Sequence, residues 1–142
     1  GVDIRYIDWA NADLFGDPAS FRGDGSLRGL GWDSGWTFAL GSQYTFSERL
    51  KLRAGYTYGA TPIDGNPETG LNVATPLILE HTLAVGASLQ VSDALAMHLA
   101  YTHGFENELK GPIQTAAGAV PASQLNQRVS AHFLTAGFTV NF

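Results

Sequence analysis

Apolar side chains alternate with small or polar ones along the end of the chain, up to a C-terminal aromatic residue. Leu134, Ala136, Phe138, Val140 and Phe142 share one parity, and the residues between them are Thr, Gly, Thr and Asn. Successive side chains of a strand point to opposite faces, so a period of two places one face of the strand against an apolar environment. The sequence therefore predicts a final β-strand with one continuous apolar face.

The same alternation recurs in five earlier stretches, so we expect six strands. They cover residues 2–9, 35–46, 50–59, 79–91, 95–105 and 128–142. Tight turns at 47–49 and 92–94 alternate with long connections rich in Gly, Pro and Asp. Short turns on one side and long loops on the other are typical of outer-membrane barrels, whose short turns are periplasmic. The predicted fold class is therefore all-β, an antiparallel up-and-down transmembrane β-barrel.

The two parities differ in charge. One carries large apolar residues and is expected to face lipid, whereas the other carries small and polar residues together with the mid-strand cations Arg5, Lys51 and Arg53. A Lys or Arg that faces lipid near the midplane costs about 2–4 kcal/mol, which explains the segregation. One half of a soluble β-sandwich also alternates, but it does not require the aromatic residues that gather at the strand ends here.

Composition and spacing argue against several classes of function. A net charge of −5 does not suit a nucleic-acid partner, and the absence of Cys excludes a thiolate metal site or nucleophile. The four His residues lack the spacing of metal-ligand motifs. Ser88 and His98 could form a pair as in barrel phospholipases, but both have inner-face parity, and a lipid-hydrolysing site should open toward the bilayer. We expect no enzyme activity, no cofactor and no metal.

Several segments, taken in order, closely resemble the C-terminal third of the FadL/TodX family of outer-membrane transporters. They are 1–9 (GVDIRYIDW), 31–41 (GWDSGWTFALG), 52–58 (LRAGYTY), 62–63 (PI), 81–87 (HTLAVGA) and the Phe-terminated last strand. The resemblance implies a barrel of about fourteen strands with an N-terminal plug, in the outer membrane of a Gram-negative bacterium. Residues 1–142 would form the C-terminal six strands, with the plug and earlier strands absent from this chain.

Resemblance to this family also implies a function and a set of partners. We expect an outer-membrane channel for uptake of long-chain fatty acids or other hydrophobic small molecules. A general diffusion porin or a structural barrel module is the alternative, although a porin should carry opposed acidic and basic ladders in its lumen. Outer-membrane lipid, lipopolysaccharide, the barrel assembly machinery and the hydrophobic substrate are the expected partners. Six strands alone would leave two unpaired edges that lipid cannot satisfy.

Three groups of residues are candidates for these contacts. Phe138, Val140 and Phe142 would form the assembly signal, or would simply face lipid. His81, His103 and His132 have lipid-face parity near the loops and could contact lipopolysaccharide phosphates, or act as ordinary interfacial residues. Arg5, Lys51 and Arg53 are the candidate ligand-binding residues of the lumen. Lys51 and Arg53 should pair with the uncharged Thr45 and Gln43 across the 47–49 turn. Their counter-ion would then be a carboxylate of the plug, one of an earlier strand, or that of a fatty acid passing through the barrel.

Overall fold

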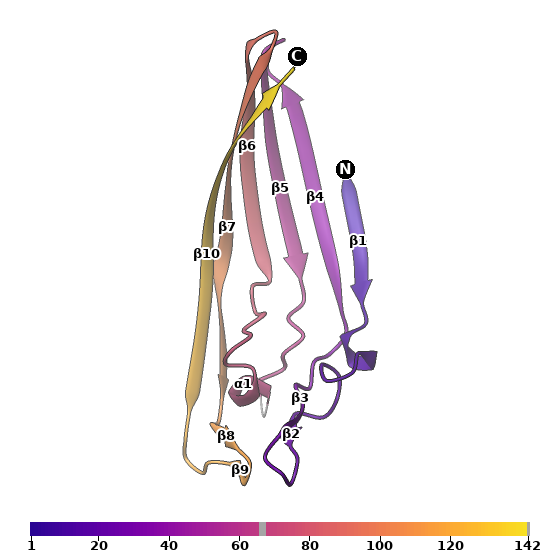
Figure 1. The fold of residues 1–142 in the computed structure, drawn as a ribbon, viewed down its shortest axis with the longest axis vertical. Coiled ribbons are helices and arrows are strands. Elements are labelled where there is room, and N and C mark those ends of the chain that lie inside the picture. Colours follow the sequence, from indigo (N-terminus) through magenta and orange to yellow (C-terminus); the bar gives the residue numbers. More distant parts are fainter. Residues whose placement is uncertain (66–67, 142) are drawn as a thin grey trace.

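A computed structural model describes residues 1–65 and 68–141 and contains a six-stranded antiparallel sheet (Figure 1). Each long strand pairs with the next long strand along the chain, so the order in the sheet follows the sequence. The tight turns and the C-terminal end lie at one end of the sheet, and the long loops lie at the other. The six strands are β1 (Val2–Ile7), β4 (Gly35–Thr45), β5 (Leu50–Gly59), β6 (His81–Ser92), β7 (Leu95–Gly111) and β10 (Leu125–Val140).

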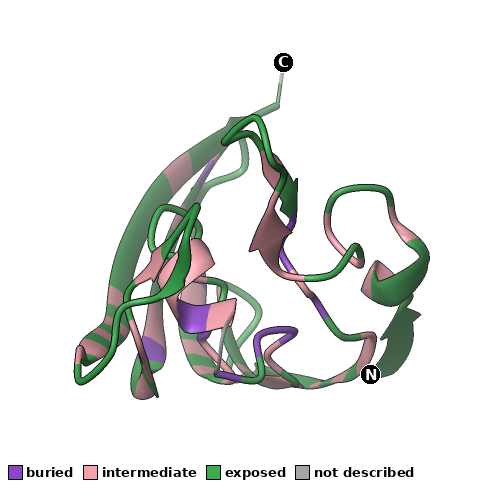
Figure 2. Cartoon of the chain, turned by 90° about the horizontal axis from the view of Figure 1, so that it is seen from below, coloured by how far each residue is buried: buried purple, intermediate pink, exposed green. Residues whose placement is uncertain are grey.

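The sheet is open. Viewed from the loop end, its strands follow an arc, and β1 and β10 are its two edges within the described residues (Figure 2). The structure therefore shows a mostly antiparallel β-sheet rather than a closed barrel. Among the described residues, no helix has the length and apolar character needed to cross a membrane.

Strand boundaries differ from the predicted ones mainly at the loop end. β1 stops at Ile7, because a 3-10 turn (η1, Trp9–Asn11) follows it. β6 begins at His81 rather than at residue 79. β7 runs on to Gly111, where it pairs with Leu125 of β10, although the prediction ended the strand at residue 105. Residues 106–111 lack apolar alternation because this hairpin projects beyond the rest of the sheet. β10 ends at Val140, and the predicted strand end at Phe142 lies outside the described residues.

Alternation sets the faces of the sheet, because the register places residues expected on the same face opposite one another in neighbouring strands. Leu40 lies opposite Tyr56, Tyr56 opposite Leu83, and Leu83 opposite His103. Large apolar side chains on this face are exposed, reaching 74% for Leu134. A face so rich in exposed apolar groups is far from the usual surface of a soluble domain, and it suits contact with lipid.

The buried hydrophobic core lies at the loop end, not between the long strands. We call it the loop core. Trp32 packs edge-on against Trp9 at a centroid distance of 5.2 Å and donates a hydrogen bond from Nε1 to Asn72 Oδ1 at 2.6 Å. The long loops therefore fold onto one another and onto the end of the β7–β10 hairpin. The loop core comprises Leu30, Trp32, Ile63 and Ile78, with Trp9, Phe15, Leu27, Leu109 and Val129 packed against them.

Short elements complete the loops at this end of the molecule. Two small hairpins and one helical turn lie among the long connections (Figure 1). None of them was predicted, because elements of two to four residues are too short to show a periodicity. They are β2 (Ser20–Phe21), β3 (Leu27–Gly29), α1 (Glu68–Leu71), β8 (Gln114–Thr115) and β9 (Gly118–Ala119).

Candidate functional site

A row of polar side chains crosses the face opposite the exposed apolar residues. Each of five long strands contributes one residue, and we call the row the polar belt. The register places Gln43 of β4 opposite Arg53 of β5, and Ser88 of β6 opposite His98 of β7. The pairing of Gln43 with Arg53, and of Thr45 with Lys51, confirms the one expected from the sequence. The polar belt comprises Gln43, Arg53, Ser88, His98 and Thr139.

Hydrogen bonds link the belt from end to end. Arg53 donates from Nε to Gln43 Oε1 at 2.9 Å and from Nη1 to Ser88 Oγ at 2.6 Å. Ser88 Oγ lies 2.7 Å from His98 Nδ1, and His98 Nε2 lies 3.0 Å from Thr139 Oγ1. Because a guanidinium can only donate, Ser88 accepts from Arg53 and can donate its own hydrogen to His98 Nδ1. His98 Nε2 can then donate to Thr139, so one direction of donation satisfies the whole row.

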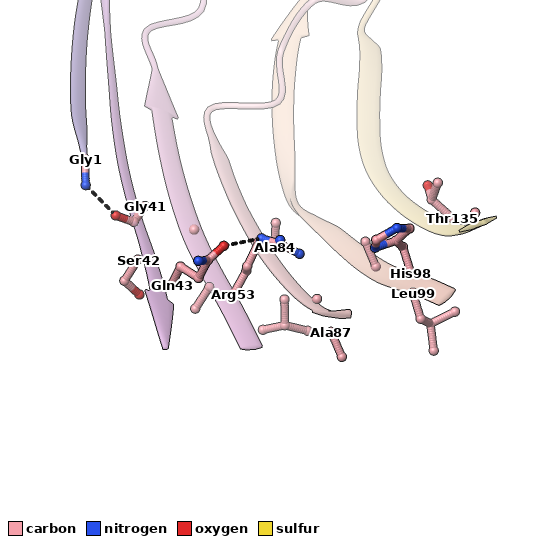
Figure 3. Close-up of a pocket in the computed structure, with 16 residues that line it drawn as sticks. Gly1, Gly41, Ser42, Gln43, Arg53, Ala84, Ala87, His98, Leu99 and Thr135 are labelled. Carbon is pink, nitrogen blue, oxygen red and sulfur yellow. Dashed lines mark hydrogen bonds between the residues drawn. The ribbon is translucent and has the colours of Figure 1, made fainter. Parts of the chain in front are cut away.

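Beside the belt, the same side of the sheet contains a hollow of about 600 Å³. The hollow is wide because its wall carries Gly and Ala where other positions would carry longer side chains. At Gly41 an added Cβ would meet nothing within 4 Å. Figure 3 shows that His98 points to one side of the sheet while its neighbour Leu99 points to the other. Lining residues include Gly41, Gly55, Ala84, Gly86, Ala100 and Gly137, with Gln43, Arg53 and His98 at the belt.

Two cations lie at this wall without an acidic partner in the described part of the chain. The ion pairs there involve Asp3 and Glu108, and neither carboxylate reaches Lys51 or Arg53. Arg53 has only neutral partners, Gln43 and Ser88. The guanidinium of Arg53 therefore lines the hollow without an acidic partner in the described residues, and Lys51 lies two positions before it on the same face of β5.

Arg5 lies on the same face of the sheet but closer to its loop end. It pairs with Asp3 at 2.6 Å and lies opposite Thr37, near the loop end of β4. Thr37 and Gln43 are six positions apart along β4, which corresponds to roughly 20 Å of strand. Lys51 and Arg53 thus lie two positions apart on the same face of β5, whereas Arg5 is remote from them and already ion-paired.

Ser88 and His98 lie within hydrogen-bonding distance but do not form a nucleophilic site. The other ring nitrogen of His98 contacts the hydroxyl of Thr139 rather than a carboxylate. Ser88 also accepts a hydrogen bond from Arg53 and is only 8% exposed. A serine that is held by a cation and has no acid behind its histidine lacks the arrangement of a catalytic triad. The contact is best described as one link of the polar belt.

The remaining candidate residues lie on the apolar face. Phe138 and Val140 are 67% and 52% exposed there, and Phe142 lies outside the described residues. His103 and His132 lie directly opposite each other in the β7–β10 pair, and His81 lies opposite Tyr58. In the described ranges, no group of three or more His, Cys, Asp or Glu residues is placed to hold a metal ion.

Hydrogen bonds to Asp8 fix the start of the first long loop. Asp8 accepts from Asn11 Nδ2 and from Ser34 Oγ, both at 2.8 Å. The hydrogen bond from Asn11, followed by that from Ser34, lowers the pKa of Asp8 below its ordinary value. The carboxylate stays ionised at neutral pH and ties the end of β1 to the segment that precedes β4.

The chain matches a known protein family over its full length. A family model described as outer membrane protein transport protein (OMPP1/FadL/TodX) matches residues 1–142. No curated protein and no solved structure matches the chain significantly.

Proposed function

The chain belongs to the FadL/TodX family of outer-membrane transport proteins, and from this premise we propose that it lines a channel for uptake of long-chain fatty acids or other hydrophobic small molecules. Proteins of this family reside in the outer membrane, transport hydrophobic compounds and are not enzymes. The further proposals concern the barrel, the path of the substrate and the residues that contact it.

Residues 1–142 would form the C-terminal six strands of a closed barrel of about fourteen strands. Three observations support this arrangement. The strands pair in sequence order, one face exposes large apolar side chains, and β1 and β10 each have one edge without a partner strand in the described residues. Further strands would close the barrel and satisfy the backbone groups of both edges. A plug would lie inside the closed barrel.

The observation that carries the proposed substrate class is the Gly- and Ala-lined hollow beside the uncompensated cations Lys51 and Arg53. A wall of small apolar groups gives an alkyl chain room without offering strong polar contacts. Two cations near the tight-turn end would attract a carboxylate, since opposite charges in a partly dehydrated channel interact more strongly than in water. An anionic amphiphile fits both parts of this wall.

A general diffusion porin or a structural barrel module is the second candidate. A porin lumen is polar and water-filled, whereas the wall here carries few charges, and Arg5 is neutralised by Asp3. The competing role for Lys51 and Arg53 is structural, namely an ion pair with a plug or with an earlier strand. A purely structural role for the two cations predicts that they do not discriminate between anionic and neutral substrates.

Replacing both cations tests the proposal. Lys51→Gln combined with Arg53→Gln in the complete transporter should slow uptake of a long-chain fatty acid by about tenfold, equivalent to losing about 1.4 kcal/mol of attraction. Uptake of a neutral hydrocarbon of similar length should be unchanged. Arg49→Gln, in the adjacent tight turn, is the matched control because it removes a charge at the same end without altering the wall.

Two results would contradict a role in substrate attraction. One is equal slowing of the anionic and neutral substrates. The other is loss of folded barrel, measured as the heat-modifiable band in outer-membrane fractions. Either result would assign Lys51 and Arg53 to a structural contact with the rest of the barrel.

A further inference from the structure

Two histidines meet on the apolar face, far from the polar belt. His103 of β7 and His132 of β10 are direct cross-strand partners, and their Nδ1 atoms are 3.2 Å apart. The two residues are 29 positions apart in the chain, so no short sequence motif predicts that they meet. Only the register of β7 and β10 brings the two imidazoles together.

The separation of the two nitrogens suits joint coordination of one metal ion. Zn²⁺ binds imidazole nitrogen at about 2.0–2.1 Å. Two such bonds at an angle of about 100° place the nitrogens roughly 3.1–3.2 Å apart. Neutral imidazole is a preferred ligand of Zn²⁺, Cu²⁺ and Ni²⁺.

His132 Nδ1 has more close polar neighbours than one two-centre hydrogen bond can serve. Its Nδ1 lies 2.7 Å from Tyr101 Oη as well as 3.2 Å from His103 Nδ1. An imidazole nitrogen carries either one hydrogen or one in-plane lone pair, so it cannot make two well-directed hydrogen bonds at once. His81 shows the simpler case, in which Nδ1 contacts Tyr56 Oη at 2.6 Å without a second imidazole nearby.

Neighbouring rings hold both imidazoles in place. His103 packs edge-on against Phe105 at 4.6 Å, and His132 stacks on Tyr101 at 6.1 Å. Side chains already held by their neighbours lose little rotamer freedom when a ligand binds. His132 is exposed and His103 half-buried. β6 begins close to this pair of histidines, and beyond them only β7 and β10 continue toward the loops. An ion arriving from the loop side can therefore reach the pair.

We propose that His103 and His132 form a chelating site for a divalent transition-metal ion, with water in the remaining coordination positions. The two imidazoles supply two of the usual four or more ligands, so binding should be reversible and sensitive to chelators. The site would lie on the outside of the wall and is independent of the proposed transport path.

Copper and zinc titrations of the protein, extracted from outer membranes in detergent and treated with chelator, test the site. Cu²⁺ should bind one per protein, and its electron paramagnetic resonance spectrum should show coupling to two imidazole nitrogens. Zn²⁺ should bind at the same stoichiometry by calorimetry. His103→Gln and His132→Gln should each weaken binding by about 100-fold, because each removes the second, intramolecular ligand.

His81→Gln is the matched control, since it lies on the same face near the same level but outside the pair. It should leave the affinity unchanged, and Tyr101→Phe should retain binding because it keeps the stacked ring. Spectra of the unmodified protein with one coupled nitrogen or none would overturn the proposal whether or not the variants fold. An equal loss of affinity in His81→Gln would also overturn it.

Discussion

Asn72 is a buried side chain that ties the loop core to α1. It is fully buried, accepts from Trp32 Nε1 at 2.6 Å, and donates from Nδ2 to the carbonyl oxygens of Leu30 at 3.0 Å and Glu68 at 2.8 Å. A buried amide is tolerated only when its donors and acceptors are matched. Asn72 meets that condition by linking the first long loop to α1.

Replacing this residue should loosen the loops while leaving the sheet intact. Asn72→Ala leaves the Trp32 indole and the Leu30 carbonyl without their partner, at a cost of about 2 kcal/mol. Hydrogen exchange over residues 27–33 should then become about thirtyfold faster. Asn11→Ala, which removes one exposed hydrogen bond to Asp8, is the control. Unchanged exchange in Asn72→Ala would show that apolar packing alone holds the loop.

At the scale of elements, β10 has a distinctive position because it is an edge strand of the sheet in the described residues and the last strand that they contain. Its even-numbered side chains form an apolar row that includes Phe138 and Val140, both well exposed. We propose that this row, continued to Phe142 in the sequence, is read by the outer-membrane assembly machinery. Plain lipid-facing packing is the competing explanation.

Removal of the last residue separates these two explanations. Deleting Phe142 from the complete protein should sharply reduce the heat-modifiable barrel in outer-membrane fractions, because the row loses its terminal aromatic residue. Phe133→Ala is the control on the same strand, since residue 133 has the opposite parity. Undiminished barrel after the deletion would reject the signal and leave only the packing role for Phe138 and Val140.

The sequence predicts well the strands that carry a repeating pattern, and poorly the contacts between residues far apart in the chain. Alternation placed a strand at 50–59, where the structure has β5, and it assigned Arg53 and His98 to the same face. The continuation of β7 to Gly111 carries no alternation, so its backbone pairing left no trace in the sequence. Trp32 with Asn72 and His103 with His132 are contacts between distant segments, and they depend on register and loop folding rather than on spacing.

The whole molecule is an open sheet with its core at one end. Among the described residues no second layer packs against the long strands, so they are held by backbone pairing, by side-chain contacts between neighbouring strands and by the loop core. Both edge strands present backbone groups that water can satisfy but lipid cannot. The sheet therefore depends on what lies beyond β1 and β10.

That dependence makes a prediction for residues 1–142 produced alone. In detergent or bilayers they should give no heat-modifiable monomer, because two strand edges stay unpaired and known single-chain barrels begin at about eight strands. Gel mobility with and without heating, together with light scattering for size, would measure this. A stable monomeric species of native mobility would contradict it and show that six strands can close.

The polar belt also helps to fix the register of neighbouring strands. A wall of Gly and Ala offers little to distinguish the correct pairing of two strands from one slipped by two residues, since either keeps apolar groups outside. A slip at any hairpin would separate one donor from its acceptor in the row from Gln43 to Thr139. Misalignment at one hairpin would thus leave buried Ser88 or its neighbours unsatisfied. The belt thus adds to the register information that contacts such as Tyr101 with His132 provide elsewhere on the sheet.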